Sequence, residues 1–168
     1  MPELERTEPP KTAAPEQMVG AFLNFLRETL IWKTDGLSLE QLTWAYAPSS
    51  LTLLGMIKHL TRVERYWFKE VLVGSETTLP WTDEQRAANW RIEPDEDADV
   101  IRARYWSTVA RSREIAAVMT WQQIARGGTG DRAGLSLGWV LSHMVEETAR
   151  HVGHADLIRE RLDGATGE

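Results

Sequence analysis

The residues best suited to chemistry lie in one stretch near the end of the chain, residues 136–162, SLGWVLSHMVEETARHVGHADLIRERL. This stretch carries three of the chain's four histidines and a glutamate: His143, Glu147, His151 and His154. Steps of four, four and three residues place all four side chains on one face of an α-helix. Burying imidazoles and a carboxylate is costly unless something pairs with them, and a divalent cation is a usual partner. The stretch therefore predicts a metal-binding helix.

The fourth histidine, His59, belongs to a second helix that we expect to begin at Ser49 or Ser50 and to run to Gly74. Its apolar residues recur at helical spacing and predict a buried stripe: Leu53, Met56, Ile57, Leu60, Val63, Trp67 and Val71. His59 lies on the shoulder of that stripe. Because helix bundles build metal sites from facing helices, His59 with Glu147 and His151 makes a candidate site for one metal. Three protein ligands leave a coordination position open, as catalytic sites do.

Each of these residues also has an ordinary structural interpretation. His59 taken alone could be a hydrogen-bonded core residue, and Glu147 with His151 could be a surface pair one turn apart. His143 and His154 could be ligands, pocket-lining groups or plain surface residues. The metal site is favoured because all four histidines gather on the shoulders of two helices.

The rest of the chain predicts an all-α protein, a four-helix bundle. We expect residues 1–14 to be a flexible N-terminal arm and residues 15–164 to form one domain. A first helix should run from Pro15 towards Gly36, followed by a connecting loop over residues 37–48, and a third helix should cover residues 97–124. The connection from Ser75 to Asp95 is long enough to cross a bundle, so the second and third helices can run parallel.

Composition excludes several classes of protein. The net charge of −6 and the pI near 5.3 argue against nucleic acid as a partner. The chain has no apolar run of about twenty residues and no signal-like start, so we expect a cytoplasmic protein without a membrane partner. It contains no cysteine, so any thiol chemistry needs a thiol from another molecule.

The segments SHMVEETARHVGHAD and HVGHADLIRE, the histidine midway along the second helix and the long crossover carry a family resemblance. From about Pro15 to Leu162 the chain resembles the DinB-like superfamily, and in its last helix an actinobacterial branch of it. Its His-Glu-His set is similar to that of the metal-binding domain of mycothiol-dependent maleylpyruvate isomerase. The resemblance implies an up-down-down-up bundle and the metal ligands His59, Glu147 and His151. His154 stands where many relatives have glutamine, which argues against its being a ligand. The chain has no counterpart of the isomerase's second domain, so the isomerase's substrate is not carried over.

The leading hypothesis for function is a metal-dependent enzyme that activates a low-molecular-weight thiol of the mycothiol type for attack on an electrophilic small molecule. Zinc is the expected metal, with nickel and iron as alternatives, and His143 or His154 is expected to move the proton. The same ligands would also suit a metal-hydroxide hydrolase or an iron(II) oxygenase. A non-enzymatic, metal-stabilised bundle that binds a partner or forms a homodimer is a further alternative.

Overall fold

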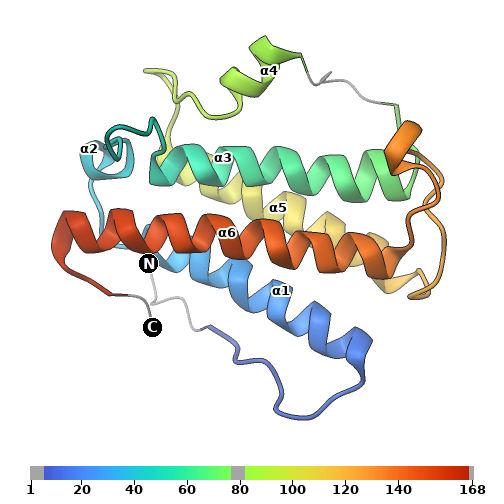
Figure 1. The fold of residues 1–168 in the computed structure, drawn as a ribbon. Coiled ribbons are helices and arrows are strands. Elements are labelled where there is room, and N and C mark those ends of the chain that lie inside the picture. Colours follow the sequence, from blue (N-terminus) through green and yellow to red (C-terminus); the bar gives the residue numbers. More distant parts are fainter. Residues whose placement is uncertain (1–5, 77–81, 167–168) are drawn as a thin grey trace. The chain divides into compact units, whose positions relative to one another are not determined.

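The computed structural model describes residues 6–76 and 82–166, and its regular structure is helical (Figure 1). Within these ranges no strand is present beyond an isolated bridge between Ile124 and Ser136. The prediction of an all-α protein is confirmed. The elements in chain order are α1 (Pro15–Trp32), α2 (Leu39–Leu42), α3 (Leu53–Glu64), the π-helix η1 (Arg65–Leu72), α4 (Asp83–Ala88), α5 (Ala98–Ala117), the 3₁₀ helix η2 (Gly130–Arg132) and α6 (Leu137–Asp163).

The chain divides into two compact units. The first comprises residues 1–56 and 141–168, and the second comprises residues 57–140. Both α3 and α6 contribute residues to each unit, since the divisions fall inside these two helices. None of the described helices combines the length and the apolar character that crossing a membrane requires.

In the first unit, α1 and α6 run in the same direction (Figure 1). Lys33, which follows α1, pairs with Asp156 near the end of α6 at 2.7 Å. One turn further on, Arg159 donates to the carbonyl oxygens of Lys33 and Asp35 at 3.1 and 2.8 Å. The guanidinium thereby satisfies carbonyl oxygens of the turn that follows α1.

In the second unit, α3 and η1 run in the same direction as α5. The Lys58 ammonium, near the start of α3, lies 2.6 Å from the carboxylate of Glu96, just ahead of α5, and η1 contacts α5. The parallel course that the long crossover allows is therefore present in this unit. The up-down-down-up order of all four long helices remains a prediction.

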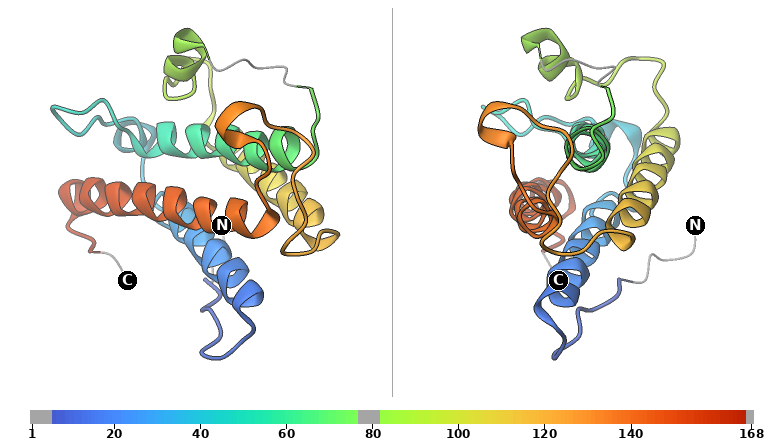
Figure 2. Two further views of the ribbon diagram at one scale, coloured as in Figure 1. Left: turned by 45° about the vertical axis from the view of Figure 1, so that its right-hand side comes forward. Right: turned by 90° about the vertical axis from the view of Figure 1, so that its right-hand side faces the viewer.

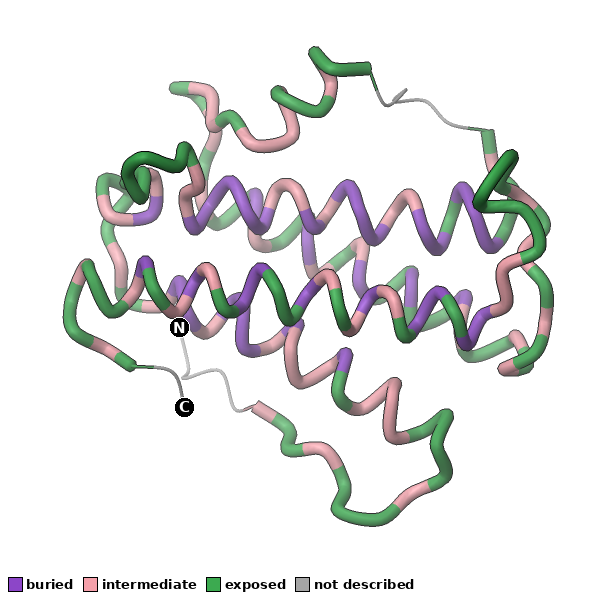
Figure 3. Tube along the Cα trace, viewed as in Figure 1, coloured by how far each residue is buried: buried purple, intermediate pink, exposed green. Residues whose placement is uncertain are grey.

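The buried stripe of the second helix is confirmed, because all seven of its predicted residues are buried (Figure 3). The helix begins later than predicted, however, at Leu53. Thr52 caps it, accepting a hydrogen bond from the Gly55 N–H at 3.0 Å. The hydroxyl of Ser49 instead accepts from the N–H of Leu51 at 3.1 Å, in the turn before the helix. The predicted caps at Ser49 and Ser50 are thus wrong.

The third helix ends at Ala117, seven residues before the predicted Ile124. The backbone of residues 121–124 is bonded to the start of α6: the Gly138 N–H donates to Trp121 at 2.9 Å and the Leu137 N–H donates to Gln123 at 3.0 Å. These carbonyls therefore lie in a loop that fastens α6, and a continued helix would not present them there.

Two segments expected to be plain connections contain short helices. α2 lies within residues 37–48, and a capping box between Ser38 and Gln41 stabilises its N-terminus. α4 lies within the crossover, and its cap Thr82 accepts a hydrogen bond from the Gln85 N–H. Sequence periodicity does not reveal elements of this length, because they are shorter than two helical turns.

Candidate metal centre

Glu147 and His151 lie one turn apart on α6, at the edge of its buried side. The side chain of His151 is 9% exposed and that of Glu147 is 16% exposed. Their neighbours Thr148, Val152 and Ala155 are buried, so the packed face of the helix fixes the line on which the two polar groups stand. The Nε2 atom of His151 lies 3.4 Å from Oε1 of Glu147. Two candidate ligand atoms thus converge from one helix.

This distance agrees with shared coordination of one ion. Zinc lies about 2.0–2.1 Å from an imidazole nitrogen and about 2.0–2.2 Å from a carboxylate oxygen, so two tetrahedral ligand atoms stand about 3.3–3.5 Å apart. A direct N–H···O hydrogen bond would be shorter, about 2.7–3.2 Å. The separation of 3.4 Å between His151 and Glu147 is therefore compatible with shared coordination of one divalent cation.

The other two histidines of α6 have different surroundings. His143 lies 3.6 Å through its Nδ1 from Oε2 of Glu146, a neighbour of the proposed ligand, and its side chain is about a quarter exposed. The ring of His154 lies 5.7 Å from that of His151 between centroids. The Nδ1 atom of His154 is buried and has no hydrogen-bond partner within the part of the chain that the structure describes. Of the two, His154 is the one beside His151.

His59 belongs to the second unit, on α3, where its ring stacks on Trp90 of the crossover. The ring centroids are 4.0 Å apart and the planes differ by 13°. The residue before His59, Lys58, donates to the carbonyl oxygen of Arg91 at 2.8 Å and to Glu96 at 2.6 Å. The crossover is thereby fastened to α3 beside His59, and Trp90 covers one face of the imidazole.

Trp90 is a neighbour of the candidate ligand His59 that sequence reasoning missed. Tryptophans are ordinarily core residues, and thirty residues of chain separate Trp90 from His59, so no spacing pattern indicates the contact. The pKa of Glu96 supports the fastening of the crossover. Burial raises this pKa, but the hydrogen bond from the Glu93 N–H and the contact with Lys58 outweigh burial and hold it below its usual value.

In the part of the chain that the structure describes, the protein is all-helical and offers two histidines and a glutamate as candidate metal ligands. Residues 18–164 match the family model described as Mycothiol-S-transferase. Since this match spans most of the chain, the protein belongs to the mycothiol-S-transferase family, and the resemblance to the DinB-like superfamily is confirmed. No curated protein matches the sequence.

Proposed function

We propose that the protein is a metal-dependent transferase that joins a low-molecular-weight thiol of the mycothiol type to an electrophilic small molecule. The convergence of the His151 nitrogen and the Glu147 oxygen at 3.4 Å supports the metal, and the family supports the thiol. The absence of cysteine is in keeping with a thiol that arrives as a cosubstrate. His59 is proposed as the third ligand, with zinc as the expected ion.

When bound, such an ion supplies Lewis acidity, which lowers the pKa of a thiol that it ligates so that the nucleophilic thiolate is present near neutral pH. The chain's own residues then have two tasks. The first task is to hold the metal ion, which would fall to His59, Glu147 and His151. Three protein ligands leave a coordination position open for a cosubstrate. A base must accept the thiol proton while the sulfur forms a bond to the electrophilic carbon and the leaving group takes the displaced electron pair.

His154 is the better placed of the two proposed proton carriers. Its ring is next to that of His151, and its buried Nδ1 is not engaged in a hydrogen bond with a described residue. The Nδ1 atom of His143 instead lies near the carboxylate of Glu146, at 3.6 Å. We therefore assign proton transfer first to His154, with His143 as the alternative.

The test combines metal analysis with thiol consumption. Protein loaded with zinc should bind about one ion per chain, and Glu147→Gln and His151→Ala should each lose it, whereas Glu146→Gln, a matched change one residue away, should retain it. The loaded protein should consume mycothiol faster than glutathione with an activated aryl halide. His154→Ala should keep the metal and lose rate. Metal that stays bound in Glu147→Gln, or ester cleavage without any thiol requirement, would overturn the proposal.

A further inference from the structure

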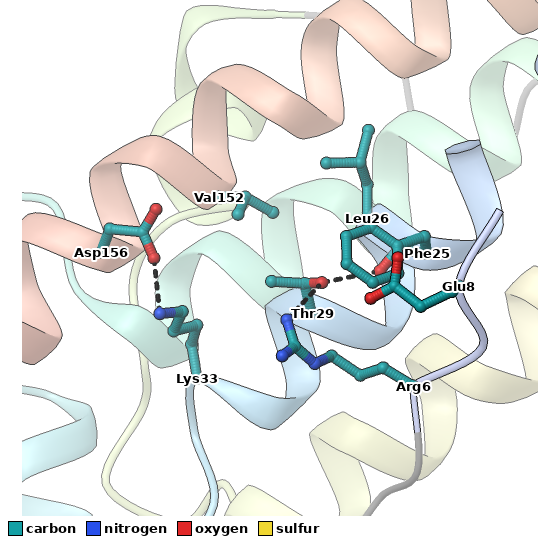
Figure 4. Close-up of a pocket in the computed structure, with 8 residues that line it drawn as sticks. All are labelled: Arg6, Glu8, Phe25, Leu26, Thr29, Lys33, Val152 and Asp156. Atoms are coloured by element: carbon teal, nitrogen blue, oxygen red, sulfur yellow. Dashed lines mark hydrogen bonds and ion pairs between the residues drawn. The ribbon is translucent and has the colours of Figure 1, made fainter. Parts of the chain in front are cut away.

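A cavity of about 630 Å³ lies in the first unit, between the N-terminal arm, α1 and α6 (Figure 4). Small-molecule sites typically have volumes of about 300–1,000 Å³. The cavity mixes charged, hydroxyl and apolar groups, and its lining residues are Arg6, Glu8, Phe25, Leu26, Thr29, Lys33, Val152 and Asp156. Asp156 follows Glu147 by nine residues, or two and a half turns, so it projects from the opposite face of α6. This cavity is therefore separate from the face that carries Glu147 and His151.

A buried cation contributes to the cavity wall. The Lys33 side chain is 1% exposed, and its ammonium lies 2.7 Å from the carboxylate of Asp156, which is 36% exposed (Figure 4). The same ammonium lies 4.7 Å from the centre of the Trp32 ring. An ammonium carries three donors, and Asp156 is its only ion-pair partner within the described residues. The buried ammonium therefore balances the charge of Asp156 in the cavity wall and leaves ligand contacts to the more accessible side chains.

A second cation enters from the arm. The guanidinium of Arg6 lies 4.3 Å from the Trp32 ring centre and 5.3 Å from that of Phe25. Stacking on aromatic faces fixes a guanidinium while leaving its N–H edge available. The hydrogen bond that Arg6 makes among the described residues is a long one, 3.5 Å to the Thr29 hydroxyl. As far as the described residues go, Arg6 is thus held in position with most of its donors unused, which suits recognition of a carboxylate.

The carboxylates in the lining decide which kind of anion fits. Asp156 is committed to Lys33, whereas Glu8 forms no ion pair with a residue that the structure describes. Two cations and two carboxylates give the lining no net charge, so a phosphate would lack a compensating charge. A ligand with its own carboxylate and ammonium would match Arg6 and Glu8 together. The apolar wall formed by Phe25, Leu26 and Val152 then receives an apolar side chain.

We propose that this cavity is a binding site for a small apolar amino acid, with the carboxylate on Arg6 and the amino group on Glu8. The N-terminal arm supplies Arg6 and Glu8, so in this proposal it forms part of the binding site. Thr7 helps to hold it there, because its N–H donates to the Glu28 carboxylate of α1 at 2.8 Å.

The experiment is a calorimetric titration of the full-length, metal-free chain with four probes: L-leucine, 4-methylpentanoate, 3-methylbutylamine and inorganic phosphate. L-leucine should bind once per chain, and each of the other three should bind at least about tenfold more weakly, since each lacks one charge-assisted hydrogen bond or the apolar group. Amide NMR signals of residues 29, 33, 152 and 156 should shift with leucine.

Arg6→Gln and Glu8→Gln should each weaken leucine binding about tenfold or more, whereas Arg111→Gln and Glu114→Gln, an exposed pair on α5, should leave it unchanged. Both test variants lie ahead of α1, so an unchanged melting curve will show that the fold is retained. No leucine binding, equal binding of 4-methylpentanoate or phosphate, or unweakened binding in Arg6→Gln would overturn the proposal. Since the protein is metal-free, the result does not depend on the proposed metal site.

Discussion

Gly127 offers the sharpest test of the packing in the second unit. The loop after α5 lies beside the end of η1 (Figure 2). The Gly127 N–H donates to the carbonyl oxygen of Val71 at 2.8 Å, and the Arg126 N–H donates to the carbonyl oxygen of Leu72 at 3.0 Å. A Cβ at position 127 would overlap the carbonyl oxygen of Glu70 and lie 2.8 Å from the Cα of Gly74. Both are backbone atoms, so no side-chain rotation relieves the overlap. Gly127→Ala must therefore push the loop away from η1.

The expected cost has two parts. Overpacking costs about 1–3 kcal/mol, and the strained hydrogen bond to Val71 contributes about another 1 kcal/mol. For a chain of this size, each kcal/mol changes the melting temperature by about 2–4 °C, so a loss of about 3 kcal/mol predicts a decrease of about 6–12 °C. Thermal melts followed by circular dichroism, with urea midpoints at 25 °C, measure this loss.

Gly20→Ala is the matched control, because a Cβ at Gly20 meets nothing within 4 Å inside α1. Replacing an unhindered helical glycine by alanine should stabilise the protein by up to about 1 kcal/mol. The two variants share the same chemical change and should move the melting temperature in opposite directions. If Gly127→Ala has the same melting temperature as Gly20→Ala, the close approach of the loop to η1 is refuted.

Three further predictions concern the candidate metal centre and its supports. Because the pKa of Glu96 is held low, its ionised form stabilises the fold at pH values above the usual glutamate pKa, and this contribution is lost as the pH falls through the lowered pKa. Glu96→Gln should therefore have a lower melting temperature than wild type at neutral pH, and the difference in melting temperature should disappear below about pH 4. Trp90→Leu removes the ring stacked on His59 and should weaken zinc binding about tenfold in a chelator competition while the helical signal is retained, and unchanged affinity would show that the stacking does not orient the imidazole. Chelation should lower the melting temperature without unfolding, since a hundredfold excess of zinc over its dissociation constant stabilises by about 2.7 kcal/mol, and an apo protein without helical signal would contradict this.

The regular parts of α3 and α6 could be predicted because their pattern is local. The seven-residue stripe of α3 follows the 3.6-residue period, and the pair of Glu147 and His151 follows from a step of four. In α1, apolar residues recur at the same helical spacing, but Leu23 and Leu30 are fully buried whereas Phe22 is 47% exposed. Periodicity identifies the face of a helix, whereas burial depends on how much of that face has a neighbour.

The π-helix η1 could not be predicted, and its consequence is specific. Arg62 and Glu70 form a buried, two-pronged ion pair at 2.9 and 3.3 Å, although eight residues separate them. In a uniform α-helix that separation leaves the two side chains about a quarter turn apart. The wider winding of a π-helix adds a residue to each turn and so rotates Glu70 back onto the face of Arg62. An unpaired charge at this buried position would be costly. The ion pair between Arg62 and Glu70 therefore stabilises the π-helical turn that brings the two side chains together.

The difference between the two halves of the candidate centre follows from the same distinction. Glu147 and His151 are brought together by one turn of α6, so their sequence spacing already makes them neighbours, and in the structure their atoms approach to 3.4 Å. His59 depends on non-local contacts: Trp90 stacks on it, and Lys58 binds the carbonyl of Arg91 and the carboxylate of Glu96. Such contacts close a loop of more than thirty residues, and the entropy of that closure must be offset by packing that no short pattern records. Changes in the crossover should therefore weaken metal binding through His59 alone, while the pair on α6 keeps its geometry.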